Sequence, residues 1–179
     1  VGNIACKVDI SGGAGRAEFK LPRLPERIEA PFDIARLASA LSIPESELEF
    51  FGHRVSIWTA GAPYVLVPVK SIAAVSNCKV DADAWLSLMQ VPGSVPAAPY
   101  IYCAGGRHRD SDFHARMLAP WDGIAEDPAT GSAVAALSGA LSQLESARYG
   151  RRHWRIEQGM EMGRPSFIEL SVEMVDGVL

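Results

Sequence analysis

Residues 126–133 read Glu-Asp-Pro-Ala-Thr-Gly-Ser-Ala and lead directly into an apolar run. Thr130 and Ser132 are residue types that cap the first turn of a helix, and Gly131 lets a ligand approach the backbone closely. The first amides of a helix have no partner within it, and the helix dipole makes that end positive, which favours a carboxylate or phosphate. Asp127 then lies at the rim of an anion site, where a carboxylate can accept or orient a proton. The segment predicts catalysis by Asp127 and ligand binding by Gly131 and Ser132.

The run that follows is apolar on nearly every face and is interrupted only by Ser138, Gly139 and Ser142. A helix that is apolar all round is buried, and this one is too short to cross a membrane. A buried helix whose first residues meet two adjacent acids indicates a site built into the middle of a domain. An ordinary capped core helix behind an acidic surface loop explains the same pattern, so both interpretations stay open at this point.

Two further polar residues, His114 and Arg116, stand two apart in a run with strand character. Side chains at that spacing point to the same face of a strand. They either face the site or form a polar pair exposed to solvent. We favour a supporting role next to Asp127, because an arginine can brace an acidic side chain through paired hydrogen bonds. Glu126 and Thr130 are the other candidates for such a role.

The rest of the chain alternates between short strand patterns and a few helical ones. Residues 4–10 and 16–21 predict a hairpin, and prolines at 22, 25 and 31 mark a stiff connector that is our candidate domain boundary. Further helices are expected at 33–41, 71–74 and 81–89, and further strands at 55–58, 64–69, 100–104, 113–119, 153–158 and 167–172. Strands surrounding one buried helix differ from a doubly wound fold, in which strands and amphipathic helices alternate. The pattern predicts an α+β fold with a curled sheet around that helix.

Composition narrows the function classes. The 179 residues are 48% hydrophobic with a net charge of −4, which fits a soluble globular domain and disfavours nucleic acid as a partner. The basic cluster at 148–155 is interpreted as a solvated turn between helix and strand. The three cysteines, Cys6, Cys78 and Cys103, have neither metal-ligand spacing nor an even count, so we expect no metal, no disulfide and a cytoplasmic location. No segment is long and apolar enough for us to expect a membrane span.

Beside the 126–133 block, the chain contains Asp-Phe-His-Ala-Arg-Met at 112–117, Glu-Gln-Gly at 157–159 and Gly-Arg-Pro-Ser at 163–166. These blocks and their spacing resemble the second domain of the phenazine-biosynthesis PhzF-like family of isomerases, over most of residues 30–172. The resemblance implies a diaminopimelate-epimerase-like fold of two α/β halves. Each half is a curled, mainly antiparallel sheet around a central helix, and the active site lies in the cleft between the halves.

The resemblance also implies an activity. The family's best-known reaction moves a proton within dihydro-hydroxyanthranilate, an acidic cyclic diene, with no metal or organic cofactor. Carried over by position, Asp127 matches a catalytic residue, and the amides of Gly131 and Ser132 match those that hold the substrate carboxylate. Diaminopimelate epimerase uses one cysteine from each half, but no cysteine lies near residue 130 here. Cysteine-based racemisation is therefore disfavoured.

The chain departs from the family pattern in its first part. The family's first domain carries an acid/base glutamate and a histidine in a Gly-His segment, and neither has a counterpart here. Residues 1–28 resemble only the last hairpin of that domain, residues 29–179 match the second domain, and the sequence begins with Val1. We expect the carboxyl-terminal portion of a longer enzyme, whose missing half is on the same or a separate chain. Two functions stay open: an isomerase completed by that half, or a non-catalytic anion-binding and interaction domain. Homodimerisation also stays open.

Overall fold

An eight-stranded curled sheet forms the body of the molecule, and a two-stranded hairpin stands beside it. The structure, a computed structural model, describes residues 5–11, 14–31, 33–89, 96–144, 149–177 and 179. The hairpin strands are β1 (Cys6–Ser11) and β2 (Ala14–Phe19). The sheet contains β3 (Glu26–Ile28), β4 (Ser56–Thr59), β5 (Pro63–Pro68), β6 (Ala98–Ala104), β7 (Phe113–Ala119), β8 (Ile124–Asp127), β9 (Gly150–Gln158) and β10 (Ser166–Met174).

The sheet has the order β10-β9-β7-β6-β5-β4-β3, and β8 pairs with the carboxyl-terminal end of β7. Its neighbours are antiparallel except β5 with β6 and β7 with β9. Parallel neighbours need a crossover connection. Between β5 and β6 that crossover contains α2 (Ile72–Asn77) and α3 (Ala82–Leu88), and between β7 and β9 it contains α4 (Gly131–Leu144).

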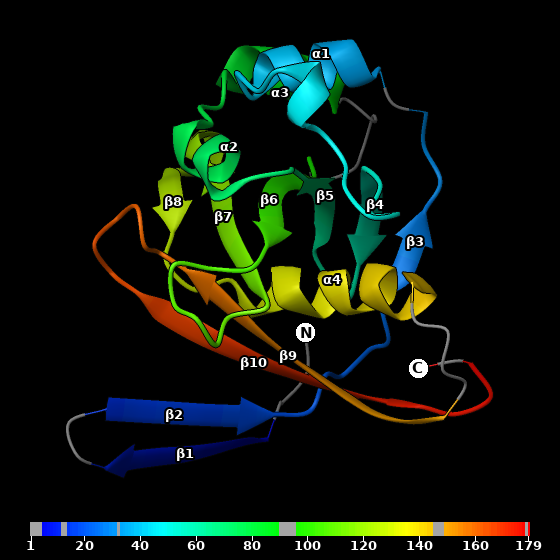
Figure 1. The fold of residues 1–179 in the computed structure, drawn as a ribbon, viewed down its shortest axis with the longest axis vertical. Helices are drawn as coiled ribbons and strands as arrows, with labels where there is room; N and C mark the ends of the chain where they lie inside the picture. The colour runs from blue at the N-terminus through cyan, green and yellow to red at the C-terminus, as the bar shows by residue number, and fades with distance from the viewer. Residues whose placement is uncertain (1–4, 12–13, 32, 90–95, 145–148, 178) are drawn as a thin grey trace.

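Helix α4 is the centre of the fold, as its apolar sequence predicts. It packs against β3, β4, β5 and β10, and Figure 1 shows it running across the ends of the strands with β9 and β10 beyond it. Ala133, Leu137 and Leu141 belong to one core cluster with side chains of the sheet. A Cβ added to Gly139 would lie 2.3 Å from the ring of Trp58, so this close packing of helix on strand requires glycine there.

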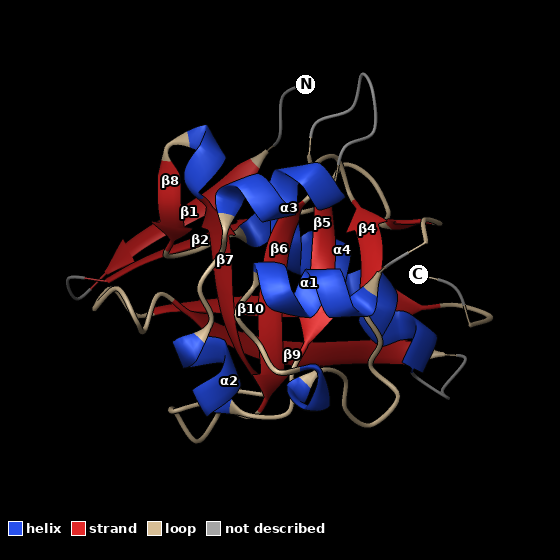
Figure 2. Cartoon of the chain, turned by 90° about the horizontal axis from the view of Figure 1, so that it is seen from above, coloured by secondary structure: helices blue, strands red, loops and turns tan. Residues whose placement is uncertain are grey.

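The opposite face of the sheet is covered by α1 (Ile34–Ala40), α2 and α3, as Figure 2 shows from above. A second apolar cluster, which includes Leu37, Val67 and Trp85, fills the space beneath them. Each of these helices begins with a side-chain cap, since Asp33, Ser71 and Asp81 accept hydrogen bonds from the amides of the first turn. None of the helices in the described ranges is long and apolar enough to cross a membrane.

The amino-terminal region differs in part from expectation. The predicted hairpin is present, although residues 12–13 of its turn lie outside the described part. Its strands are exposed, with Val8 66% and Ile10 80% accessible. The connector expected to be stiff contains a short strand, β3, which pairs with β4 and joins the main sheet. Residues 26–28 thus belong to the sheet, while the assignment of residues 1–28 to another domain stays a prediction.

Candidate functional site

Asp127 ends strand β8, which lies against β7 with Met117 opposite Asp127. Sequence reasoning placed Glu126 and Asp127 in a loop, and the structure corrects this because both residues pair within a sheet. The Asp127 side chain is half-buried. Its Oδ2 accepts a hydrogen bond from the Thr130 hydroxyl at 2.7 Å, and its Oδ1 accepts a weaker one from the Ala129 amide at 3.4 Å. The carboxylate is therefore held directly in front of α4.

The first turn of α4 leaves two amides free. The amides of Ala133 and Val134 donate to the Thr130 carbonyl at 3.1 and 3.2 Å. Within the described ranges, the amides of Gly131 and Ser132 have no hydrogen-bond acceptor. The expected capping by Thr130 and Ser132 does not occur, since the Thr130 hydroxyl donates to Asp127 and the Ser132 hydroxyl contacts Tyr64. Two free donors at the positive end of a helix thus lie beside a fixed carboxylate.

Tyr64 on β5 connects the exposed Ser132 to the interior. The two hydroxyl oxygens lie 2.7 Å apart, and Tyr64 itself is only 7% exposed. Burial raises the pKa of the Tyr64 phenol, and the nearby Asp127 carboxylate raises it further against the opposing effect of the Ser132 hydrogen bond. The phenol therefore stays protonated at neutral pH. When it donates to the Ser132 oxygen, the Ser132 proton is free for a ligand.

Gln158, the last residue of β9, lies behind the same turn and is fully buried. Its Nε2 donates to the Asp127 carbonyl at 2.7 Å and to the Thr130 hydroxyl at 2.8 Å. Its Oε1 accepts from the Thr130 amide at 3.2 Å and from the Tyr100 hydroxyl at 3.3 Å. The segment from Asp127 to Thr130 is thereby attached to the core through one side chain.

Two segments distant in sequence border the site. A Cβ added to Gly131 would lie 3.8 Å from the ring of Phe19, so this hairpin residue stands over the start of α4. A Cβ at Gly159, where φ is +77°, would lie 2.3 Å from the Arg164 carbonyl and 3.0 Å from Pro128. Only glycine fits there, and it brings the 159–164 loop against Pro128.

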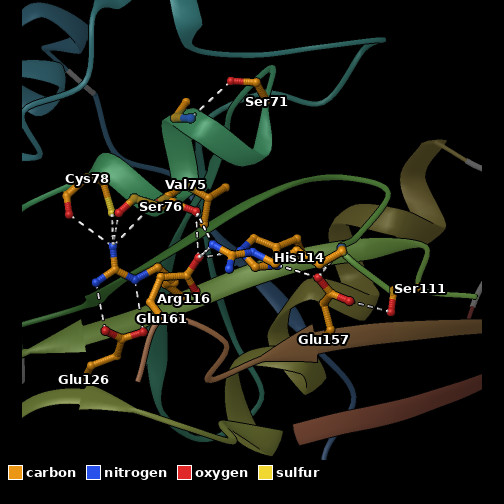
Figure 3. A network of polar contacts seen from close by, with 12 residues as sticks. Ser71, Val75, Ser76, Cys78, Ser111, His114, Arg116, Glu126, Glu157 and Glu161 are labelled. Atoms are coloured by element: carbon orange, nitrogen blue, oxygen red, sulfur yellow. Dashed lines mark hydrogen bonds and ion pairs between the residues drawn. The ribbon is translucent and has the colours of Figure 1, made fainter. Parts of the chain in front are cut away.

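Arg116 supports the strand that carries Asp127. Its Nε and Nη2 donate to the two carboxylate oxygens of Glu126 at 3.0 and 2.8 Å. Its Nη1 lies 3.1 Å from the carbonyl oxygens of Val75, Ser76 and Cys78 at the end of α2. Figure 3 shows this guanidinium between Glu126 and the end of that helix. The expected bracing of an acid beside Asp127 is therefore present, with Glu126 as the acid.

His114 points elsewhere. It is fully buried, with Nδ1 2.6 Å from Glu157 and Nε2 3.1 Å from Glu161 (Figure 3). Carboxylates only accept, so both ring nitrogens donate when the ring is protonated. Glu157 also accepts from the amides of Arg107 and His108 and from the Ser111 hydroxyl, at 2.6 to 2.9 Å. His114 is thus the centre of a buried ionic cluster and not a solvent-facing residue.

Comparison with known proteins identifies the family to which the chain belongs. The family described as phenazine biosynthesis-like protein, PhzC-PhzF, matches residues 3–178. The chain belongs to this family. The match extends beyond the residues 30–172 expected from the motifs and includes the hairpin strands.

Similar proteins of known sequence or structure confirm the fold, and this chain covers only part of their length. An uncharacterised isomerase of Mesorhizobium japonicum is 39% identical over all of this chain and 60% of the relative. Trans-2,3-dihydro-3-hydroxyanthranilate isomerase of Pseudomonas aeruginosa is 31% identical over 74% of this chain and 42% of that enzyme. The crystal structure of a PhzF-family protein of Bacillus anthracis has a TM-score of 0.81 at 18% identity, covering 95% of this chain and 56% of the other. The predicted fold class is confirmed, and the chain spans roughly half of these relatives.

The buried cysteines of this PhzF-like chain are poorly suited to acid/base chemistry. Burial raises the pKa of Cys78 to about 11, although the Arg116 charge opposes it. Burial likewise raises the pKa of Cys103 to about 12. Both thiols stay protonated near neutral pH, and a thiol must ionise to act as a base.

The ionic cluster predicts a pH dependence of stability. Burial disfavours the charged His114 ring, but the hydrogen bonds that the ring donates to Glu161 and Glu157, together with the negative charges of these carboxylates, outweigh burial and raise the His114 pKa. Burial would raise the pKa of Glu161, yet the hydrogen bonds from His114 and Ser76 lower it to about 2. A raised histidine pKa stabilises the fold below the ordinary value of 6.5, and this contribution is lost as pH rises through the folded value. The lowered Glu161 pKa stabilises the fold above pH 4.5, and this contribution is lost as pH falls toward about 2.

We therefore expect the stability lost in His114→Asn to be largest at mildly acidic pH and to shrink as pH rises through the raised His114 pKa. Urea unfolding of the native and variant proteins across this range measures the difference. His53→Asn is the contrasting variant, because burial lowers the His53 pKa and its contribution must grow as pH rises. A His114→Asn difference that is constant with pH would contradict the charged state of the ring.

Proposed function

We propose that this chain supplies the carboxylate-binding half of a PhzF-like isomerase site, in which Asp127 transfers or orients a proton on a small acidic substrate. The observation that carries the proposal is the pair of free amides at Gly131 and Ser132 beside the held Asp127 carboxylate. The first three helices use side-chain caps at their starts. At α4 the corresponding hydroxyl is directed to Asp127, which leaves its end open for an anion.

The chemistry follows from these donors. Removal of a proton next to a carboxylate or a conjugated ring creates an electron-rich intermediate. The preorganised amides stabilise the charge that spreads onto the substrate carboxylate, whereas the Ser132 hydroxyl binds that carboxylate before and during the reaction. Asp127, fixed by Thr130, is placed to exchange or orient the proton. This reaction uses no metal and no organic cofactor.

The substrate class and partner are also part of the proposal. The relative from Pseudomonas aeruginosa is named for trans-2,3-dihydro-3-hydroxyanthranilate, which makes this acid the first substrate to test. A second acid/base group, a glutamate, comes from the half of the relatives that this chain does not span. We call the chain together with that half the two-half enzyme. Free Cys6, Cys78 and Cys103 fit a cytoplasmic location for it.

Ser132→Ala tests the carboxylate-binding role. We expect the Kd of the two-half enzyme for the test acid to rise roughly tenfold or more, because a hydrogen bond to a charged group is lost. The turnover number should change much less. Isothermal titration and steady-state kinetics separate the two effects.

Ser142→Ala is the matched control for this experiment, because Ser142 lies near the far end of the same helix and donates to the Ser138 carbonyl. Unaltered affinity in Ser132→Ala would remove Ser132 from the binding site. Binding of the acid by the two-half enzyme without turnover would favour the second candidate, a non-catalytic anion-binding domain.

A further inference from the structure

The buried amide of Gln158 has one possible orientation. The Thr130 amide can only donate, and it points at Oε1 over 3.2 Å. The Asp127 carbonyl can only accept, and it lies 2.7 Å from Nε2. Rotating the amide by half a turn would set donor against donor and acceptor against acceptor. The main-chain groups of the site therefore fix which atom of Gln158 faces which partner.

This orientation also fixes the direction of a proton in the site. Gln158 Nε2 donates to the Thr130 hydroxyl oxygen at 2.8 Å. Because that hydroxyl has a single proton and now receives one from Gln158, its own proton is directed to Asp127 Oδ2 at 2.7 Å. A chain of donors runs from Gln158 through Thr130 to the Asp127 carboxylate.

Gln158 holds Asp127 at two points. Through Nε2 it binds the Asp127 carbonyl directly, and through Thr130 it orients the carboxylate. The neighbouring Gly159 packs the next loop against Pro128, so the turn between strand and helix is enclosed from that side. Buried polar side chains are costly unless every partner is satisfied, and this one makes four hydrogen bonds, three of them to Asp127 and Thr130.

We infer that Gln158 is the positioning residue of the proposed proton-transfer site, acting on Asp127 through its main chain and through Thr130. The inference rests on the proposed function of Asp127. Gln158 acts on the reaction only by setting the place and hydrogen bonding of the Asp127 carboxylate. Small displacements of a reacting group lower rates steeply, so loss of this support should appear in kcat more than in KM.

Gln158→Glu tests the inference, because glutamate has nearly the same shape and differs in one donor group. As a carboxylate it faces the Asp127 carbonyl with an acceptor, and it gives the Thr130 hydroxyl no proton. Burial beside Asp127 favours the protonated acid, whose O–H can replace one of the two lost donors. The ratio of variant to native kcat in the two-half enzyme should be about one tenth or less at alkaline pH and should recover several-fold as pH falls.

Gln143→Glu is the matched control, because Gln143 is exposed near the end of α4 and the substitution is identical. Its ratio of kcat values should stay near one at all pH values. A Gln158→Glu ratio that is independent of pH, or one that matches the control, would overturn the inference. Thermal unfolding of both variants shows whether either substitution causes a general structural defect. Recovery of kcat at lower pH is a second control, because a misfolded variant would not recover.

Tyr100→Phe is the second test of the inference, for use if Gln158→Glu does not fold. It removes the hydroxyl that donates to Gln158 Oε1 and leaves the hydrogen bonds from Gln158 to the Asp127 carbonyl and the Thr130 hydroxyl in place. We expect kcat to fall about threefold with KM unchanged, and an unchanged kcat would overturn the inference. Asp127→Asn is measured in the same series: normal turnover there refutes the proposed function itself, whereas a loss there with a pH-independent Gln158→Glu defect refutes only the role of Gln158.

Discussion

Asp127→Asn is expected to lower the turnover number of the two-half enzyme by roughly a hundredfold or more, which is the usual contribution of a positioned acid/base group. The substitution keeps the shape of the side chain, and the amide oxygen can still accept from the Thr130 hydroxyl and preserve the turn. What is lost is the ability to take up and return a proton. Steady-state kinetics with trans-2,3-dihydro-3-hydroxyanthranilate measure this effect.

Asp122→Asn is a suitable control for this variant. Asp122 is exposed in the short turn Pro120–Asp122 that precedes β8, so the same change of charge occurs nearby without touching the site. We expect its turnover to be unchanged. If Asp127→Asn retained full turnover while binding the acid normally, Asp127 would have no part in the chemistry.

Glu157→Ala is expected to lower the free energy of unfolding by about 3–5 kcal/mol, the cost of removing one partner from a buried ionic cluster. Four donors lose their acceptor at once: the His114 ring, the Arg107 and His108 amides and the Ser111 hydroxyl. Small domains have about 5–15 kcal/mol of stability, so this one change removes a large part of it. Urea unfolding at mildly acidic pH, where His114 is charged, gives the value.

Glu169→Ala provides the comparison on the neighbouring strand. Glu169 also pairs with two basic residues, His153 at 2.6 Å and Arg155 at 3.5 Å, but its side chain is 39% exposed. An exposed pair contributes about 1 kcal/mol or less. Equal losses in the two variants would show that the Glu157 cluster is not the buried support that its contacts indicate. Glu157→Gln should give an intermediate loss, since glutamine keeps the shape of the side chain and one acceptor oxygen.

The parts of the fold that the sequence predicts are those with a local pattern. An all-round apolar run identified α4, and alternation of apolar residues identified most of the strands of the main sheet. Strands β3 (Glu-Arg-Ile) and β8 (Ile-Ala-Glu-Asp) were missed because neither contains an alternation of apolar residues. Their pairing with β4 and β7 depends on contacts between distant segments, which local alternation does not encode. The residues at 150–152, expected to be part of a turn, instead begin β9, and Arg148 of the same cluster lies outside the described part.

The residues of the candidate site also fall into two groups: those with a local sequence signal, and those whose contacts are distant in sequence. Asp127, Gly131 and Ser132 lie within six residues and carry a readable local signal. Tyr64 and Gln158 were missed as site residues, because the contacts to Ser132 and Thr130 span 68 and 28 positions of sequence. A weak signal did exist for Gln158: it follows the apolar Ile156 by two positions and so lies on the same face of the strand, where a buried polar side chain needs hydrogen-bond partners. His114 was recognised, but its partner Glu157, 43 positions away, was not.

The central claim is that the free amides at the start of α4 bind a carboxylate. The most direct measurement is an amide-resolved NMR titration of the ¹⁵N-labelled two-half enzyme with benzoate. The account predicts that the Gly131 and Ser132 amide signals move most and saturate together, and that Ser132→Ala weakens this binding. Saturable shifts confined to another surface, with both of these amides unmoved, would contradict it.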